Sequence, residues 1–478
     1  MAGKTISFRW RRHPGLIVLA VHACLFACLT WWSWRKWPDP LIDFGRELYV
    51  PWQLTLGKVL YRDIATIFGP LSPYVNAFWF KLFGVSLTSL ILLNLAILAA
   101  VLAGIHHLLR ISTDRLTATV ATLSVMLLFG FSQYVETGNY NFVAPYAHEA
   151  THGIALTVAI LIALYHGVVA RRPSLFAVAG GCFGLLLLTK PETSLAASAA
   201  VVVGFSATTF LGPNERRCLS RSILVFLIAA AVPPLLFFAY FRMHMPANDA
   251  LRAVGGAWTM ALATSIAHNV FYLRGMGLDD TFGNASRMLL VFTGFLVFVG
   301  SAVAVSWNDF EMETRRRRIM YRVARLALTS AACWIVCLRF VDIPRALPLI
   351  TLTALGTCAI LFYKRRRDRE WVVRLLPLLM WSAFAFVLLA KMWLNTRIFH
   401  YGFFLALPAT TIAIVTMFDL IPTALGHACE LRQERTRPIR REIIDDENLN
   451  FQRQSNGTDA RHDLANREAF VVGSDDNR

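Results

Sequence analysis

The stretch SLTSLILLNLAILAAVLAGIHHLL, residues 86–109, contains no Asp, Glu, Lys or Arg and is long enough to cross a bilayer as one helix. Comparable apolar runs recur along the 478-residue chain. They lie near 15–34, 116–134, 153–170, 174–189, 193–211, 222–241, 286–306, 323–340, 346–363, 375–394 and 402–421. The sequence therefore predicts an all-α, polytopic membrane helix bundle of about 12 spans.

The overall composition supports a membrane protein. Hydrophobic residues make up 56% of the chain and charged residues 16%, whereas a soluble domain is roughly 45–50% apolar and about 25% charged. This surplus excludes a disordered chain, a collagen-like chain and a typical soluble enzyme. The formal net charge is +17. The positions of the basic residues decide whether this charge reflects membrane topology or a nucleic-acid partner.

The Lys and Arg residues gather in alternate segments between the apolar runs, which predicts the topology. We expect the N-terminus and the C-terminus on the cytoplasmic side of the inner membrane. The long connections at 35–82, 134–153 and 242–287 then lie on the outer face, where we expect the active site. The positive charge is accounted for by topology and by contact with anionic membrane lipids, and no nucleic-acid partner is expected. Residues 1–421 form the expected membrane domain, and 422–478 a polar, flexible cytoplasmic tail.

The first outer connection is the part of the sequence richest in motifs. It begins with DPLIDFGRE at 39–47, followed by an amphipathic stretch, GKVLYRD at 57–63, FGPLSPY at 68–74 and NAFWFKLFG at 76–84. Trp and Tyr at this density are typical of helices that lie at the membrane interface. We therefore expect a long first outer loop that carries interfacial helices.

This order of motifs resembles the first outer loop of class C glycosyltransferases, the polytopic enzymes of the protein mannosyltransferase and aminoarabinose transferase type. Weaker similarities are YNFVAPYAH at 140–148, LTKPE at 188–192 and HYGFFLALP at 400–408. In layout the resemblance extends over about residues 15–415. It implies inverting transfer of a sugar from a polyprenyl-phosphate donor to an acceptor of unknown class. It implies no nucleotide cofactor, and it leaves the need for a divalent metal open.

The resemblance places the catalytic carboxylate early in the first outer loop, at Asp43. A transfer of this kind needs a base that takes the proton from the acceptor. The alternative role for Asp43 is to cap the following helix, which Asp does well. Asp39, Glu47 and Asp63 are the second acidic candidates, and an ion pair with a nearby Arg is the alternative for Asp63.

Four further residues are candidates for binding the donor. Lys190 and Glu192 lie between two apolar runs, and charges that face the inside of a helix bundle are usually functional. Arg397 and His400 lie at the outer end of the last span. All four are predicted to contact the donor phosphate or sugar. The structural alternatives are a side chain that extends to the interface and an interfacial anchor.

A competing motif, His148-Glu149-Ala-Thr-His152, matches H-E-x-x-H. On a helix it places both histidines on one face, with the Glu as general base of a zinc-dependent membrane protease. The spacing singles out no third ligand. Polar lining of an outer cavity is the other interpretation of these three residues. Membrane transport is the third function class, although we find no repeat that relates the two halves of the chain.

Overall fold

The computed structural model describes residues 14–36, 41, 44–134, 140–210, 213–261, 269–308 and 342–423. Regular structure in these ranges is helical, apart from an isolated bridge between Leu60 and Ile64. Asp39, Asp43, the expected span at 323–340 and almost all of the expected tail lie outside the described residues. By internal contacts the chain divides into Met1–Asp419 and Leu420–Arg478. Every side chain discussed below belongs to the first unit.

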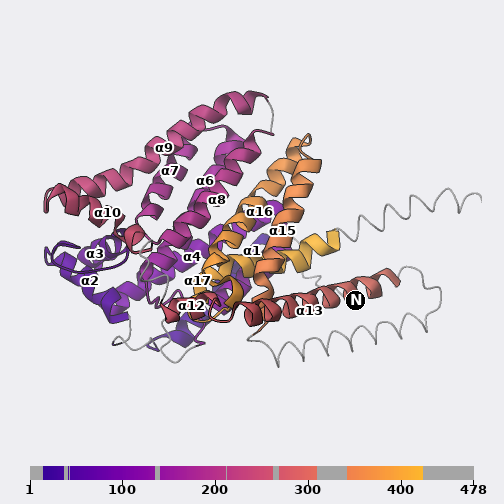
Figure 1. The fold of residues 1–478 in the computed structure, drawn as a ribbon, viewed down its shortest axis with the longest axis horizontal. Helices are drawn as coiled ribbons and strands as arrows, with labels where there is room; N and C mark the ends of the chain where they lie inside the picture. Colours follow the sequence, from indigo (N-terminus) through magenta and orange to yellow (C-terminus); the bar gives the residue numbers. More distant parts are fainter. Residues whose placement is uncertain are drawn as a thin grey trace, which may run out of the picture. The chain divides into compact units, whose positions relative to one another are not determined.

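Within the described ranges, eight helical segments are long and apolar enough to cross a membrane. Each expected span except the one at 323–340 coincides with a helix, so the all-α polytopic bundle is confirmed (Figure 1). The helices are α1 (Pro14–Ser33), α4 (Leu87–Ser112), α5 (Arg115–Val125) with η2 (Met126–Gly130), α6 (His148–Ala170), α7 (Pro173–Leu187), α8 (Pro191–Thr208), α9 (Pro213–Arg242), α13 (Thr281–Asn308), α15 (Leu347–Lys364), α16 (Arg369–Leu388) with η4 (Leu389–Asn395), α17 (Gly402–Leu405), and α18 (Leu407–Val415) with η5 (Thr416–Leu420).

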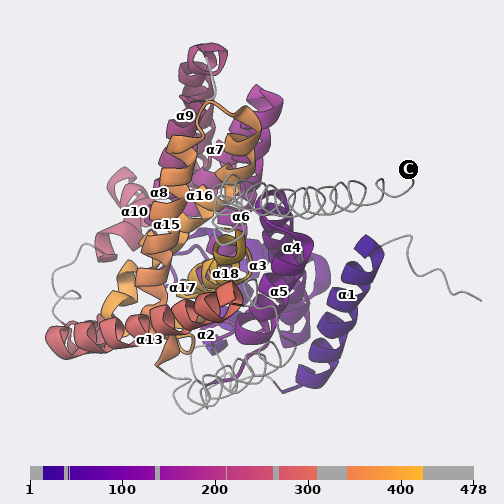
Figure 2. The ribbon, with the colours of Figure 1, turned by 90° about the vertical axis from the view of Figure 1, so that its right-hand side faces the viewer.

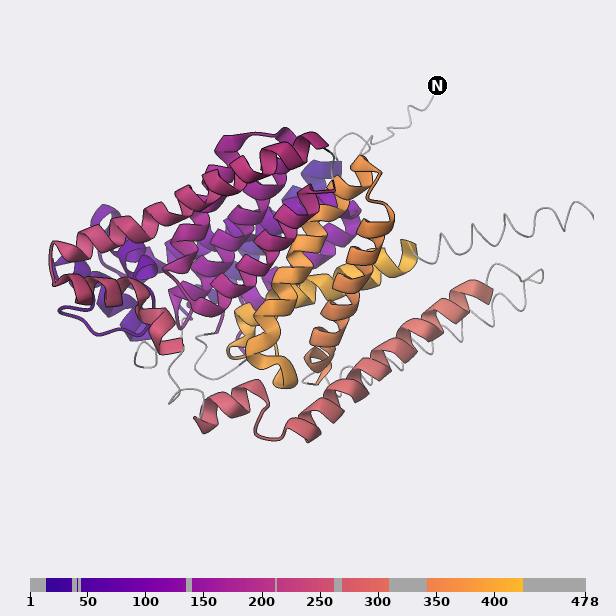
Figure 3. The ribbon, with the colours of Figure 1, turned by 45° about the horizontal axis from the view of Figure 1, so that its top comes forward.

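Shorter helices form the expected outer connections. They are α2 (Gly45–Thr55), α3 (Leu71–Phe83), α10 (Ala247–Ala261), α12 (Val270–Met276) and η3 (Ile343–Ala346). In α2, Val50 and Leu54 are buried while Tyr49 and Trp52 remain exposed, so this helix is amphipathic. Its apolar face packs in one cluster with residues of α3, α9 and α10. Helices α2, α3 and α10 and the C-terminal end of α9 lie together at one end of the bundle (Figures 1 and 3).

The helices of the bundle pack closely where small residues allow it. Figure 2 shows α8, α15 and α16 side by side, and α8 and α15 both pack against α16. Helix α7 packs against α9 through Gly180 and Gly184. A Cβ atom at Gly180 would lie 2.2 Å from the Phe226 carbonyl oxygen. Close backbone approach of this kind is how membrane helices gain packing energy in the absence of a hydrophobic driving force.

The first outer loop is fastened to the turn between α7 and α8. The Gly69 N–H donates to the Thr189 carbonyl at 3.2 Å, and the Leu71 N–H donates to the Leu188 carbonyl at 3.1 Å. A Cβ atom at Gly69 would lie 2.1 Å from the Leu188 oxygen, so only glycine permits this approach. The loop motifs and the start of α8 are therefore held next to one another, which sets up the site.

Candidate functional site

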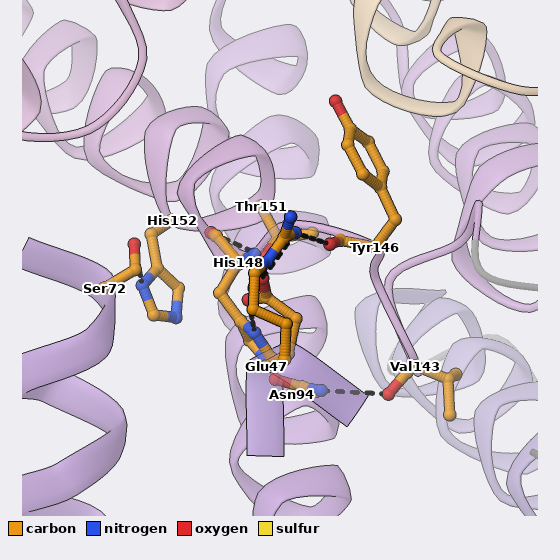
Figure 4. Close-up of polar contacts among 9 residues, drawn as sticks. Glu47, Ser72, Asn94, Val143, Tyr146, His148, Thr151 and His152 are labelled. Atoms are coloured by element: carbon orange, nitrogen blue, oxygen red, sulfur yellow. Dashed lines mark hydrogen bonds and ion pairs between the residues drawn. The ribbon is translucent and has the colours of Figure 1, made fainter. Parts of the chain in front are cut away.

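Glu47 joins the first outer loop to the start of α6. Its side chain is 7% exposed. One carboxylate oxygen accepts from Arg46 Nη2 at 2.9 Å. The other accepts from the His148 backbone N–H at 3.0 Å and lies 2.6 Å from His148 Nδ1 (Figure 4). Because both oxygens are engaged, Glu47 is placed to hold α2 on α6 rather than to accept a proton from a substrate.

The charge state of Glu47 follows from these neighbours. Burial raises its pKa, but the hydrogen bonds from His148 and the charges of His148 and Arg46 together hold the pKa below its ordinary value. Arg46 also donates to the Tyr146 carbonyl at 2.7 Å. The acidic candidate Glu47 is thus an ionised residue that links the first and second outer connections.

Helix α6 begins at His148, five residues before the expected span at 153–170. The first backbone N–H groups of a helix have no acceptor within the helix. The Glu47 carboxylate is the acceptor for the N–H group of His148. This contact lets a polar first turn be buried, and His148, Glu149 and His152 are all at most 5% exposed. The H-E-x-x-H residues therefore occupy the first turns of a helix.

The arrangement of the two histidines allows a test for a metal ion. His148 Nδ1 faces Glu47, and His152 Nδ1 lies 3.0 Å from Ser72 Oγ (Figure 4). The Nε2 atoms of both rings are buried without a hydrogen-bond partner, as a metal ligand would be. However, the described residues contain no group of three His, Cys, Asp or Glu that could hold a metal. Within the described part of the chain the two histidines therefore form no zinc centre, and no chemical step is assigned to a metal.

Glu149 lines a narrow cleft beneath the first outer loop. The cleft encloses about 260 Å³ of empty space, including the part open to solvent. Its walls come from α2, α3, the start of α6 and the loop at Phe68. The lining residues are Arg46, Glu47, Val50, Pro51, Thr66, Phe68, Pro73, Asn76 and Glu149. Sequence motifs from two of the expected outer connections thus meet in one small space.

Lys190 lies in a cage of aromatic rings. Its Nζ donates to the Tyr146 hydroxyl at 2.5 Å. It also lies 4.8 Å from the Phe68 ring centre, 4.6 Å from Tyr146 and 5.4 Å from Phe404, within the range of cation–π attraction. Burial lowers the pKa of Lys190, and the charges of Glu192 and Glu149 oppose that shift. The Lys190 cage brings the first loop, the second loop and α17 to one point.

Glu192 pairs with Lys391, a residue that the sequence analysis did not single out. Lys391 Nζ lies 2.6 Å from Glu192 Oε1, and the two side chains are partly buried. The missed signal was a lone lysine within the apolar run at 375–394, which in a membrane helix usually indicates a functional site or an ion pair.

A second pocket, of about 420 Å³ including its open part, lies between α12 and the segment from η4 to α17. Two of its lining residues, Lys391 and Arg397, are basic. Arg397 Nε is buried and has no hydrogen-bond partner within the described residues. The remaining lining residues, largely apolar and aromatic, are Phe271, Tyr272, Gly275, Met276, Met392, Tyr401 and Leu405. The pocket combines fixed positive charge with apolar walls.

His400 lies beside this pocket but carries no charge at neutral pH. Burial, and then the charge of Arg397, lower its pKa to about 4. Its ring packs on Tyr140 with centres 4.2 Å apart and on Tyr401 with centres 4.1 Å apart. His400 can therefore offer a neutral ring nitrogen to a ligand, while Arg397 provides the charge.

Asp63, another acidic candidate, pairs with its neighbour. Arg62 Nη2 lies 2.9 Å from its carboxylate, and the Val59 backbone N–H donates to it at 2.8 Å. The hydrogen bond from Arg62 is the main reason that the pKa of Asp63 falls to about 2. No hydrogen bond joins Asp63 to the Glu47 network or the Lys190 cage among the described residues. This geometry agrees with the ion-pair alternative.

Comparison with known proteins gives no family-model match and no match among curated proteins. Among solved structures, the chain resembles the oligosaccharyltransferase of Archaeoglobus fulgidus in complex with Zn and sulfate, at 18% identity and a TM-score of 0.45. That alignment covers 87% of this chain and 51% of the other. The archaeal oligosaccharyltransferase AglB of the same organism, with an inhibitory peptide and a dolichol-phosphate, gives 17% identity and a TM-score of 0.43 over 86% and 51%.

The chain therefore spans about half the length of the structures that it matches. These structures are oligosaccharyltransferases by name.

Proposed function

We propose that this protein is an integral membrane glycosyltransferase that moves a sugar from a polyprenyl-phosphate donor to an acceptor on the outer face of the membrane. The observation that supports this most is the pairing of two sites. One is an apolar pocket with two basic residues, Lys391 and Arg397, and the other is a cleft lined by two carboxylates, Glu47 and Glu149. The pocket supplies the cations that a leaving phosphate needs, and the cleft is lined by the first outer loop, whose sequence also contains the carboxylate proposed as base, Asp43.

The pocket suits a lipid phosphate on chemical grounds. A polyprenyl phosphate has an anionic head and an apolar chain. Lys391 and Arg397 provide charge-assisted hydrogen bonds to the head, while Phe271, Met392 and Leu405 provide an apolar surface for the first isoprene units. Lys391 is held in place by Glu192. Arg397 Nε has no partner within the described residues, so it can donate to the phosphate without breaking an existing bond.

The reaction needs a base for the acceptor and cations for the donor phosphate. The acceptor hydroxyl loses its proton to a carboxylate and attacks the anomeric carbon. The bond between that carbon and the phosphate oxygen breaks, and polyprenyl phosphate leaves with the bonding electrons. Attack from the face opposite the phosphate inverts the configuration. The cations stabilise the phosphate as its charge increases. We assign the base to Asp43, which precedes the cleft residue Arg46 by three positions in the sequence.

The remaining donor candidates have supporting roles in this proposal. Tyr401, which lines the pocket, packs on Tyr146 with ring centres 5.1 Å apart, and Tyr146 accepts from Lys190. Lys190 in turn lies over Phe68, which lines the cleft. This chain of contacts connects pocket and cleft. It supports a role for Lys190 in binding the transferred sugar between the two.

The test is binding of sugar-free polyprenyl phosphate to the purified full-length protein. We expect Arg397→Gln and Lys391→Gln each to weaken binding about tenfold to a hundredfold, because each removes a charge-assisted hydrogen bond. Arg252→Gln is the matched control, since Arg252 is an exposed residue of α10 that lines neither site. Equal binding by all variants, or no consumption of labelled polyprenyl-phosphate sugars by the wild type, would overturn the proposal.

A further inference from the structure

Two histidine rings meet between α4 and α6, away from the sites described above. His107 Nε2 lies 2.9 Å from His166 Nε2. The ring centres are 5.2 Å apart, and the ring planes are inclined by 27°. His107 is exposed and His166 is half-buried. The two rings therefore form a pair that a ligand can reach from outside the bundle.

The pair lies near the opposite end of α6 from the candidate site. His166 follows His148 by 18 positions in the same helix. At a rise of 1.5 Å per residue, this separates the two residues by about 27 Å along the helix axis. Helix α4 ends at Ser112 and α6 ends at Ala170, so each ring lies within about two turns of a helix end.

Close packing fixes the distance between the two helices beside the pair. A Cβ atom at Gly104 would lie 2.3 Å from Val158 Cγ1 and 3.3 Å from Ile162 Cδ1. Gly104 and His107 are three positions apart in α4, and Ile162 and His166 are four apart in α6, so each two share a helix face. The packing of α4 on α6 therefore holds the two imidazole rings opposite one another.

The short distance between the rings decides which ligand suits them. A neutral imidazole carries one N–H and one nitrogen with a free lone pair. At 2.9 Å one Nε2 donates and the other accepts. An anion would need an N–H on both Nε2 atoms, which would place two protons between the nitrogens. A cation that takes a lone pair from each ring avoids this clash.

The spacing also suits a metal ion that binds both rings. Zinc binds histidine nitrogen at about 2.0–2.1 Å, so two nitrogens on one ion lie roughly 2.9–3.4 Å apart when the angle at the metal is between about 90° and 109°. The observed 2.9 Å lies at the lower end of this range. The rings need only turn about their side-chain bonds to aim both lone pairs at one ion, and the helices can stay in place.

We propose that His107 and His166 bind one divalent transition-metal ion, with water in the remaining coordination positions. The proton that one Nε2 carried moves through solvent to Nδ1 of the same ring, so both rings stay neutral. Imidazole suits Zn²⁺, Cu²⁺ and Ni²⁺, whereas Mg²⁺ and Ca²⁺ prefer oxygen ligands. Neither histidine lines the cleft or the pocket, so the site is independent of the proposed function.

The bound ion joins α4 to α6 at the end of the bundle opposite the cleft. Structural zinc sites have four protein ligands, and this site supplies two. The ion is therefore exchangeable, and its occupancy follows the concentration of free metal. Because the ion binds the folded protein, it raises thermal stability as its concentration rises.

The experiment uses the purified full-length protein without a histidine tag. With less than one equivalent of Cu²⁺, the hyperfine splitting in the EPR spectrum counts the ring nitrogens on the ion, and we expect two in the wild type. Zn²⁺ should raise the melting temperature, and Mg²⁺ should not. His107→Asn and His166→Asn should each weaken binding about a hundredfold or more, because loss of an outer-shell partner alone costs about 10–100-fold.

His244→Asn is the matched control and should bind metal as the wild type does. His244 is half-buried, and its Nδ1 donates to the Tyr240 carbonyl at 2.8 Å. Wild-type affinity in His107→Asn or His166→Asn overturns the proposal. So does equal stabilisation by Mg²⁺, or binding that survives in both variants and is lost in His152→Asn, which would place the ion at H-E-x-x-H. Each single variant suffices for the test, since both rings reach the surface.

Discussion

The cleft beneath the first outer loop and the pocket beside η4 are both lined by charged residues, but the two sites handle charge differently. In the cleft, Glu47 is fully bonded to Arg46 and His148, so its charge is used to hold helices together. In the pocket, Arg397 keeps a buried nitrogen without a partner within the described residues. A charge that is already paired contributes to architecture, whereas an unpaired one is available to a ligand.

This difference separates positioning residues from residues that contact substrate. Glu192 pairs with Lys391, and we propose it as a positioning residue. The Lys391 ammonium group carries three hydrogen-bond donors, so this pair leaves donors for the phosphate. Glu149 belongs with Arg397 among the groups that have spare hydrogen-bonding capacity. The predictions below test this division, beginning with the residue whose loss should matter most.

Replacing Asp43 by Asn should produce the largest loss. Asn keeps the size and the helix-capping ability of Asp but cannot accept a proton, so transfer should fall by about 10²- to 10⁴-fold with folding intact. The measurement is sugar transfer from a polyprenyl-phosphate donor, with thermal stability in detergent recorded in parallel.

The matched control for Asp43 is Asp63→Asn in the same loop. Asp63 is paired with Arg62 near the surface, and surface pairs contribute little, so transfer should change less than about threefold. Near-wild-type transfer by Asp43→Asn would remove Asp43 as the base and direct the same test to Asp39.

Replacing Glu47 by Gln should affect stability more than chemistry. The change removes the charge from a buried network, at a cost of about 2–4 kcal/mol in unfolding free energy. Because the pKa of Glu47 is lowered in the folded state, its stabilisation is present above the ordinary value of 4.5. It is lost as the pH falls through the folded-state pKa. The difference between wild type and variant should therefore shrink below pH 4.5.

The exposed Glu370 of α16 provides the control for this measurement. Glu370→Gln should leave both stability and its pH dependence unchanged. If Glu47→Gln is as stable as wild type yet transfers no sugar, Glu47 acts on substrate, and the division between paired and unpaired charges does not hold in the cleft.

The helices could be predicted from the sequence because the apolar residues of a membrane span are consecutive in the chain. The run at 86–109 became α4, and the run at 174–189 became α7. The apolar run at 153–170 marks only part of α6. The helix begins at His148, because its polar first turn is stabilised by Glu47, a residue 101 positions away in the chain.

The site could be predicted only in part, for the same reason. Individual residues such as Lys190 and Arg397 stood out because charges are rare next to apolar runs. Their contact partners could not be predicted in this way. Lys391 and Glu192, for example, are 199 positions apart, so no local sequence pattern indicates that they form a pair.

Replacing Lys190 by Gln tests whether its ammonium group holds the structure together or binds the donor. If the ammonium group contacts the donor phosphate, affinity for sugar-free polyprenyl phosphate should fall about tenfold. Lys81→Gln is the control, since Lys81 is an exposed residue near the end of α3. Unchanged affinity with lowered thermal stability would assign Lys190 to the architecture, held by Tyr146 and the surrounding rings.

The smallest expected effect concerns His400 and appears only as a dependence of stability on pH. Its pKa is about 4 in the folded protein and about 6.5 in an unfolded chain. As the pH falls from 6.5 towards 4, the unfolded chain binds a proton that the folded protein does not, so stability decreases over that range. His400→Asn should lack this part of the slope, and Asn tolerates the positive φ of 55° at this position. The side chain is only about half buried, so after allowance for solvent screening the difference should be about 1 kcal/mol.

The measurement compares the melting temperatures of wild type and His400→Asn at pH 7.5 and pH 5. Both values lie above the range in which Glu47 titrates, so the two effects separate. The other histidines are present in both proteins, so their contributions to the pH dependence cancel in the comparison. Identical slopes for the two proteins would mean that His400 is protonated as readily as in water. In that case His400 would join Arg397 as a second charge available to the phosphate, and the pocket would bind its ligand more tightly as the pH falls.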